Sequence, residues 1–384
     1  MPKKILITSF FFYPENKPRA FRTYELAKGL SSSGHDVTVV TPTYDCDYSR
    51  LNIDYPALIL KQIPKVKKQI KFDNTSQKKS RKKSIFNNSI VKYLFYFFIA
   101  SGRDAKYAYQ LALFLRKNKS EYDVVISISY PYSVHLGTIL ALALGYIKTK
   151  KYFTEFGDTF VGCPALPNSI IHRIYQKIIS IWTNCIVVPT DKAIPNFSIY
   201  KNEKSIKVIP QGYDFNEVKI EEYSGNSVPT FGYAGSFHAQ ARNPKIFLEY
   251  LSKLDRDFRF VVYSNIKDSV LVEMFDHYKS ILGDKLIIRG IIPRLEVLKE
   301  LSTFDFLIFE ENLSNNQSPS KIVDYKLTTR PIFSFSQNEL SEIKFSEFLN
   351  GDYTNQDYLE FNINDFSINH TIKQYDQLIY EENN

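Results

Sequence analysis

The sequence has few cysteines and lacks the marks of an exported chain. The three cysteines, Cys46, Cys163 and Cys185, are scattered and form no CxxC pair or Cys/His cluster, which argues against a disulfide framework and a zinc site. The apolar run at the N-terminus is interrupted by Tyr13-Pro14-Glu15, and no small-residue cleavage site follows it. We therefore expect a buried first strand, in a protein of the reducing cytoplasm.

Positive charge is concentrated in one segment and is scarce elsewhere. The formal net charge is +8, and the segment from Lys61 to Lys83 holds ten Lys/Arg and a single acid, Asp73. The rest of the chain is therefore almost neutral. Only Phe72 is interleaved with these charges, whereas nucleic-acid binding by stacking needs several aromatic side chains. We expect no nucleic-acid partner.

No apolar run is long enough to cross a bilayer, which takes roughly 20 residues. The longest one, Ile90 to Ala100, has 11 residues, is rich in aromatics and is broken only by Lys92. Together with the basic segment it has the composition of a peripheral anchor on anionic lipid, where each basic residue contributes about 1 kcal/mol. The alternative is a solvated loop followed by a core helix.

Length and composition predict two well-packed domains. A chain of 384 residues is too long for one typical domain, and 44% hydrophobic residues can fill two cores. The 27 tyrosines and 30 phenylalanines should supply much of that packing.

Strand-like and helix-like segments alternate along the first half of the chain. The expected strands are short and β-branched, with a helix or loop crossover between them, which is typical of a parallel, doubly wound sheet. Strands are expected at 4–12, 36–41, 123–129, 151–156 and 185–189, and helices at 20–30, 88–117, 133–144 and 170–182.

The same alternation starts again after the turn signal Pro210-Gln211-Gly212 and the polar linker through Ser224-Gly225-Asn226. We predict an α/β protein of two tandem doubly wound, Rossmann-like domains facing a central cleft: 1–195 with an insertion at 61–100, then 196–355, with a C-terminal helix in 356–384 packing back on the first domain. Strands are expected at 231–235, 258–264, 286–290, 306–310 and 332–335, and helices at 244–254, 269–282, 294–302 and 321–327.

The most informative stretch runs from Gln317 to Ser336. Ser318 to Ser320 form a polar turn, and Lys321 opens a helix, whose N-terminal N–H groups and dipole favour an anion. Asp324 lies one turn further on the same face, so the pair offers a cation for phosphate and a carboxylate for sugar hydroxyls. The alternative is an ordinary capped helix with two solvated charges.

Six segments in order, over about 330 residues, resemble motifs of bacterial family-4 glycosyltransferases of the GT-B fold, in the subgroup with "SPSK" and "RNP" motifs. They are ILITSFFFYPENKPRAFRTYELAKGLSSSGHDVTVVTP, SYPYSVHLGTILA, TEFGDTF, VIPQGYD, FGYAGSFHAQARNP and SPSKIVDYKLTTRPIFSF. This resemblance implies a retaining transfer of sugar from a nucleotide diphosphate to an acceptor hydroxyl, with no metal and no other cofactor.

The resemblance also implies roles for individual residues. Arg242 and Lys321 match the cations that stabilise the leaving diphosphate, and His135 matches a histidine near the transferred sugar. For each, an alternative is open: a surface charge, a helix-start lysine and a core histidine. The donor side is expected to include Gly235, Ser236, Asn316, Ser318, Pro319, Ser320 and Asp324, and the acceptor side Glu15, Asn16, Arg19 and Asp158.

Three positions depart from the family pattern. Asn316 stands where the first carboxylate of a pair is expected, Asp324 replaces a glutamate, and Asn16-Lys17-Pro18 replaces a pair of glycines. These departures keep a second class open, a non-catalytic nucleotide-sugar-binding protein of a biosynthetic complex. A sugar epimerase of the same fold is a third, against which the "SPSK" and "RNP" matches speak.

The acceptor and the location follow from the resemblance and the basic segment taken together. We expect a lipid-linked glycan acceptor in the synthesis of O-antigen, capsule or exopolysaccharide. The protein is expected to be cytoplasmic and peripheral on the inner face of the bacterial plasma membrane, held through Lys61–Lys83 and Ile90–Ala100.

Overall fold

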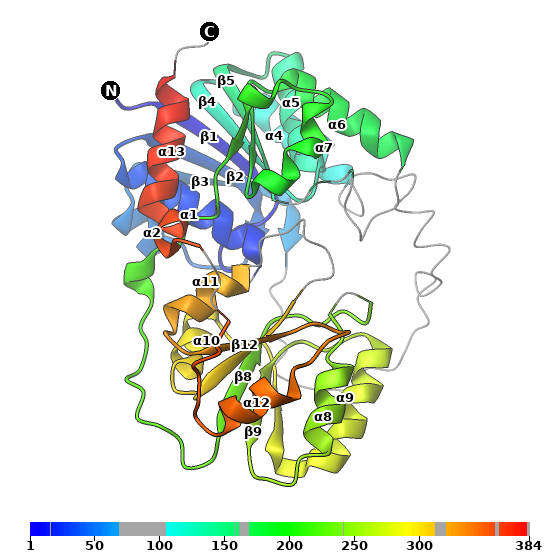
Figure 1. The fold of residues 1–384 in the computed structure, drawn as a ribbon. Coiled ribbons are helices and arrows are strands. Elements are labelled where there is room, and N and C mark those ends of the chain that lie inside the picture. Colours follow the sequence, from blue (N-terminus) through cyan, green and yellow to red (C-terminus); the bar gives the residue numbers. More distant parts are fainter. Residues whose placement is uncertain are drawn as a thin grey trace.

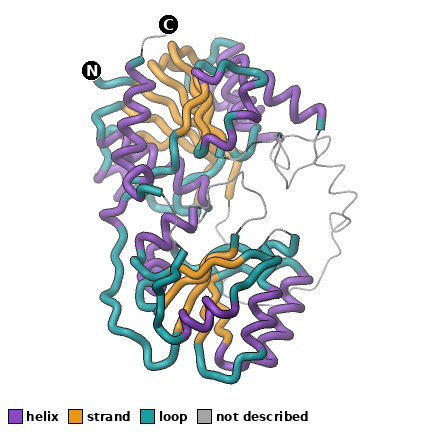
Figure 2. Tube along the Cα trace, in the orientation of Figure 1, coloured by secondary structure: helices purple, strands orange, loops and turns teal. Residues whose placement is uncertain are grey.

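The chain folds into two lobes, each built on one parallel sheet (Figure 1, Figure 2). In the computed structural model the first sheet has seven strands and the second has five. This confirms the predicted α/β class with two tandem doubly wound domains. The structure describes residues 1–15, 17–68, 105–157, 159, 161, 169–240, 242–311, 320–357 and 361–381.

The first sheet has the order β3-β2-β1-β4-β5-β6-β7, and all its pairs are parallel. Consecutive residues such as Ile5, Leu6 and Ile7 are completely buried, as expected for strands covered on both faces. The strands are β1 Lys4–Ser9, β2 Asp36–Tyr44, β3 Leu58–Lys68, β4 Ser120–Ser129, β5 Ile147–Phe156, β6 Cys185–Val188 and β7 Ile206–Val208, and the helices are α1 Pro18–Ser32, α2 Ser49–Asp54, α4 Ala105–Lys117, α5 Ser133–Ala143, α6 Ile170–Trp182 and α7 Pro195–Ser198.

The second sheet has the order β10-β9-β8-β11-β12 and is also parallel. Its core is aromatic: Phe231 stacks on Phe260 and Phe306, with ring centroids 5.2 and 4.8 Å away. The strands are β8 Thr230–Ala234, β9 Arg259–Tyr263, β10 Leu286–Arg289, β11 Phe306–Glu310 and β12 Ile332–Phe335, and the helices are α8 Lys245–Ser252, α9 Ser269–Leu282, α10 Arg294–Leu301, α11 Ser320–Leu327 and α12 Glu342–Leu349.

The first residues of the basic segment form a strand, so the solvated loop considered for this segment is wrong there. β3 continues to Lys68 and forms the edge of the first sheet, where Leu58 and Ile63 are buried on opposite faces, in separate apolar clusters. Lysines suit such an edge because they discourage pairing with another chain. Residues 69–104 lie outside the described residues, and with them the rest of the basic run, the stretch Ile90–Ala100 and the first part of the helix expected at 88–117.

The C-terminal helix, α13 Ile368–Tyr380, packs on the first domain beside α1, where Figure 1 draws it next to the sheet. Ile372 and Tyr375 join the same apolar cluster as Leu26 of α1. The two helices approach closely at Gly29, where a β-carbon would lie 2.5 Å from a side-chain carbon of Ile372. None of the described helices is both long enough and apolar enough to span a membrane.

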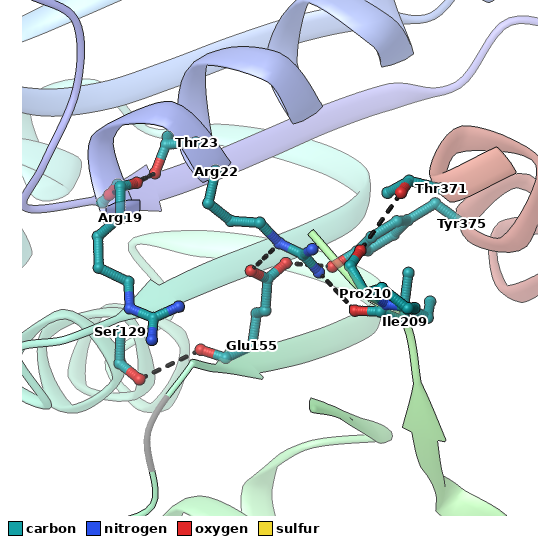
Figure 3. A network of polar contacts seen from close by, with 10 residues as sticks. Arg19, Arg22, Thr23, Ser129, Glu155, Ile209, Pro210, Thr371 and Tyr375 are labelled. Atoms are coloured by element: carbon teal, nitrogen blue, oxygen red, sulfur yellow. Dashed lines mark hydrogen bonds and ion pairs between the residues drawn. The ribbon is translucent and has the colours of Figure 1, made fainter. Parts of the chain in front are cut away.

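A buried polar network ties this helix and the interdomain connection to the first sheet (Figure 3). Arg22 of α1 donates from Nε to Glu155 of β5 at 2.5 Å and from a terminal nitrogen to the carbonyl of Ile209 at 3.0 Å. The hydroxyl of Tyr375 in α13 donates to the second oxygen of Glu155. Thr371 reaches the carbonyl of Pro210 at 3.3 Å.

The charges in this network are shielded from water. Arg22 is 3% exposed, Glu155 2% and Tyr375 0%. Burial lowers the pKa of Arg22, but Glu155 and Tyr375 together outweigh it and the pKa of the guanidinium rises. Because each buried charge is costly without its partner, the network is strong only as a unit.

We expect Arg22→Met to destabilise the first domain by ~3–5 kcal/mol, because it leaves Glu155 as a buried unpaired carboxylate. Tyr375→Phe should cost less, since it removes one hydrogen bond to that carboxylate. The only tryptophan, Trp182, lies in α6, so its fluorescence during urea unfolding reports on this domain alone.

The matched control is Glu121→Gln, which breaks the exposed ion pair with Lys148 and should leave the unfolding midpoint unchanged. An Arg22→Met protein with the midpoint of the wild type would contradict the structural role of the network.

Candidate functional site

The two central strands of the second sheet mark the place where a ligand is expected. From β8 the chain order runs outward through β9 and β10 on one side and through β11 and β12 on the other. Ligands of such sheets bind beyond the carboxyl ends of the strands at this reversal of order. The segment that follows β8 carries Gly235 and Ser236, predicted on the donor side, and Arg242. Lys321, which follows β11, is with Arg242 one of the two cations predicted to stabilise the diphosphate.

Lys321 packs directly over the backbone of Gly235. A β-carbon at Gly235 would lie 2.0 Å from Cε of Lys321, and the φ of this glycine is +143°, a conformation that other residues rarely adopt. Any larger residue at 235 would therefore displace the lysine. The glycine is needed for the position of the ammonium group.

The ammonium of Lys321 is held by an aromatic partner. Its Nζ donates to the hydroxyl of Tyr233 at 2.5 Å and lies 3.9 Å from the centre of the same ring. The helix that carries it is fixed to β8 because the backbone N–H of Ala234 donates to the hydroxyl of Tyr325 at 3.0 Å. Burial and the charge of Arg242 hold the pKa of Lys321 well below its usual value, opposed by Glu310.

Arg242 returns to the same place from the loop after β8. One terminal nitrogen donates to the carbonyl of Ser236 at 3.1 Å, while its buried Nε has no hydrogen-bond partner among the described residues. Reciprocal backbone hydrogen bonds of 2.9 Å with His238 close the loop. Burial, Arg242 and Lys321 all lower the pKa of His238, so this imidazole is neutral near pH 7.

Two cations and one carboxylate, Glu310, meet at this edge of the sheet. Arg242 and Lys321 each influence the pKa of Glu310, and Arg242 lowers that of Lys321. The two positive charges repel each other when no anion is bound. A bound anion reduces this repulsion. Glu310 was not predicted as a site residue from the sequence. The feature that could have indicated it is an acidic residue at the end of the otherwise apolar strand FLIFE, which is fully buried in the structure.

Asp324 lies one turn beyond Lys321, as predicted, but has a partner that the sequence did not indicate. Nε and one terminal nitrogen of Arg294 both donate to Oδ1 of Asp324, at 2.9 and 2.5 Å. The guanidinium of Arg294 also lies 4.5 Å from the ring centre of Tyr213 in the interdomain connection. Burial raises the pKa of Asp324, and Arg294 opposes this shift. Contact of Asp324 with ribose hydroxyls stays a prediction.

On the first domain, Glu15 lies between two neighbours at the end of β1. The hydroxyl of Tyr44 donates to one carboxylate oxygen at 3.0 Å, and Nζ of Lys17 lies 2.5 Å from the other. Lys17 also lies 4.4 Å from the ring centre of Phe11. Glu15 is thus paired with a lysine whose side chain is half exposed.

Arg19 lies against Gly157 at the end of β5. A β-carbon on Gly157 would be 1.4 Å from the central carbon of the Arg19 guanidinium, so only glycine leaves room for it. Here a guanidinium from α1 occupies the space beside that position.

His135 is part of the first domain's core. It is completely buried, its Nδ1 lies 2.6 Å from the hydroxyl of Ser127, and its ring is 4.6 Å from that of Phe156. Burial lowers its pKa to about 3, so the imidazole is neutral. Its Nε2 has no hydrogen-bond partner among the described residues. A contact with the transferred sugar stays a prediction.

Several predicted site residues lie outside the described residues. They are Asn16, Asp158, Asn316, Ser318 and Pro319, together with the side chain of Ser320.

In the described part of the chain, no group of three or more His, Cys, Asp and Glu side chains is arranged to hold a metal ion.

Comparison by sequence gives no relatives: no family model matches the chain, and no curated protein matches it.

Comparison by structure, in contrast, gives matches over nearly the whole chain. A glycosyltransferase from Rickettsia africae superposes with a TM-score of 0.60 at 14% identity, covering 99% of this chain and 98% of that one. HepE from Anabaena, in complex with UDP and glucose, gives 0.64 at 10% identity, covering 99% and 100%. TarM from S. aureus, in complex with Fondaparinux, α-GlcNAc-glycerol and UDP, gives 0.59 at 10% identity, covering 98% and 100%.

The chain therefore has the two-domain fold of these glycosyltransferase structures, from end to end. At identities this low the likeness shows the fold alone. The case for an activity has to come from the residues of the site.

Proposed function

We propose that this protein is a glycosyltransferase that uses a nucleotide-diphosphate sugar as donor. The observation that carries the proposal is the meeting of Arg242 and Lys321, with Gly235 beneath the lysine, at the reversal point of the second sheet. Two cations held close together by the fold suit a diphosphate, which carries two negative charges when it leaves the sugar. Complexes of HepE and TarM with UDP support this choice of ligand.

The chemistry follows from where charge develops. The acceptor hydroxyl attacks the anomeric carbon while the bond from that carbon to the diphosphate oxygen breaks. Arg242 offers a fork of N–H donors and Lys321 a point charge to the departing oxygens. Without a bound anion, Arg242 destabilises the protonated form of Lys321. A bound diphosphate stabilises that form, so it raises the pKa of Lys321 and is itself held more tightly.

The stereochemistry of the reaction and the absence of a metal ion are proposed from the sequence resemblance. It implies retention at the anomeric carbon, with the departing phosphate taking the acceptor proton, so no side chain is assigned as general base. It likewise implies that side-chain cations, not a metal ion, stabilise the leaving group.

The acceptor that we propose is a lipid-linked glycan in the synthesis of bacterial cell-surface polysaccharide. WaaB, a lipopolysaccharide outer core galactosyltransferase with a TM-score of 0.55 at 12% identity, supports such an acceptor class. The basic segment from Lys61 to Lys83 fits a location on the inner face of the plasma membrane.

The test is to incubate the protein with UDP- and GDP-sugars and to measure release of the nucleoside diphosphate. We expect slow release without acceptor and faster release with acceptor. Lys321→Met should weaken binding of the diphosphate by about 10- to 100-fold, since it removes a charge-assisted contact. Lys326→Met, on the same helix but bound to the carbonyl of Phe361, should change it less than about twofold.

Binding of donor without any release would point to the non-catalytic class. Equal nucleotide binding by the Lys321→Met variant and the wild type would remove the basis of the proposal.

A surface on α6 supports attachment to a membrane. Its exposed face combines aliphatic side chains with a tryptophan, and two exposed basic residues, Arg173 and Lys177, border them. Such a face suits the interface of a bilayer with anionic headgroups. The apolar members are Ile170, Ile174, Ile178, Ile181 and Trp182, which are between 37% and 69% exposed.

We expect the double variant Ile174→Asp with Ile181→Asp to lose at least about tenfold in binding to vesicles of phosphatidylcholine with phosphatidylglycerol, because buried aliphatic area and charge attraction both fall. Sedimentation with vesicles measures this. The control is Ile281→Asp on α9, an equally exposed isoleucine in the second domain. Equal loss in both variants, or in neither, would argue against α6 as the contact.

A further inference from the structure

Glu310 is a buried carboxylate that the described protein leaves without a partner. It is the last residue of β11, pairs in register with Phe335 of β12 and is 2% exposed. Neither of its oxygens accepts a hydrogen bond from any described residue. Buried carboxylates are ordinarily satisfied, because desolvation without compensation is costly.

The two nearby cations do not satisfy it. The ammonium of Lys321 donates to Tyr233, and the guanidinium of Arg242 donates to the carbonyl of Ser236. Their charges are felt from a distance: burial raises the pKa of Glu310 to about 7, while Lys321 and Arg242 oppose the rise. Glu310 is thus within electrostatic range of both cations without forming an ion pair with any described residue.

The chemistry of a carboxylate restricts what this group can bind. In its ionised form it repels phosphate oxygens, so the ligand of that form brings hydrogen-bond donors. The part of a nucleotide sugar that offers donors close to a diphosphate is its hydroxyl groups, on the ribose or on the transferred sugar. Asp324, the carboxylate expected to receive them, already accepts two hydrogen bonds from Arg294.

We propose that Glu310 accepts hydrogen bonds from hydroxyl groups of the bound nucleotide sugar, beside the diphosphate held by Arg242 and Lys321. This rests on the proposed function. It assigns a donor-binding role to a residue that the sequence motifs did not include, and it provides a carboxylate in a chain that has Asn316 where the resemblance expects one.

The test compares dissociation constants of UDP, UDP-glucose, UDP-N-acetylglucosamine, GDP and GDP-mannose for wild type, Glu310→Gln and Glu311→Gln. Calorimetry at pH 8 keeps the carboxylate ionised. Glu311 is the adjacent, exposed carboxylate, so its variant changes the net charge equally. Electrostatics alone predicts tighter anion binding on loss of Glu310, because a negative charge near the diphosphate disappears.

Hydrogen bonding predicts the opposite sign. We expect Glu310→Gln to weaken the binding of the nucleotide sugar by about tenfold or more, and Glu311→Gln to change it less than about twofold. If only the binding of the nucleotide sugar is weakened, the contact is with the transferred sugar. If the binding of UDP or GDP is weakened equally, the contact is with the ribose. Unchanged or tighter binding of both overturns the proposal.

Two further readouts separate other causes. The thermal unfolding midpoint of Glu310→Gln should equal or exceed that of the wild type, because an unpaired buried charge is removed; a lower midpoint means that the carboxylate is structural and overturns the proposal. Failure of the wild type to bind any of the five ligands would overturn the proposed function, and this inference with it.

Discussion

The buried contact of Arg22 with Glu155 is the interaction on which the arrangement of the chain depends. It joins α1 to β5, and through the carbonyl of Ile209 and the hydroxyl of Tyr375 it also holds the connection to the second domain and the returning C-terminal helix. Since such charges are stable only as a set, the network fixes where the chain leaves the first sheet and where it comes back. The second sheet is thereby attached at two points of the chain.

The candidate site differs from this network because its cations outnumber its carboxylates. Arg242 and Lys321 are brought together with one carboxylate, Glu310, and in the described part of the chain neither cation forms a hydrogen bond to it. The repulsion between the two cations is unfavourable for folding. It occurs at the carboxyl ends of β8 and β11, the position at which doubly wound sheets bind ligands. The paired charges of the first domain therefore contribute to its stability, and the excess of positive charge in the second domain provides the capacity to bind an anion.

The sequence predicted the architecture well because short β-branched strands and helices alternate with clear turn signals; α6, α9, β11 and β12 have the expected bounds. It predicted β3 poorly, because the strand is rich in lysine and its buried residues Leu58 and Ile63 lie on opposite faces, so no simple alternation marks it. Arg242 and Lys321 could be predicted from motifs that follow strand ends. The pairing of Asp324 with Arg294 and the isolation of Glu310 could not, because they depend on side chains more than ten residues apart in the chain that only the folded sheet brings together.

Amide hydrogen exchange tests most directly whether the carboxyl edge of β8 and β11 binds a nucleoside diphosphate. We expect millimolar UDP or GDP to slow exchange in peptides covering 233–240 and 321–327, and to leave exchange in α9 Ser269–Leu282 unchanged. Unaltered exchange in both segments, at concentrations where calorimetry detects binding, would contradict binding at this edge.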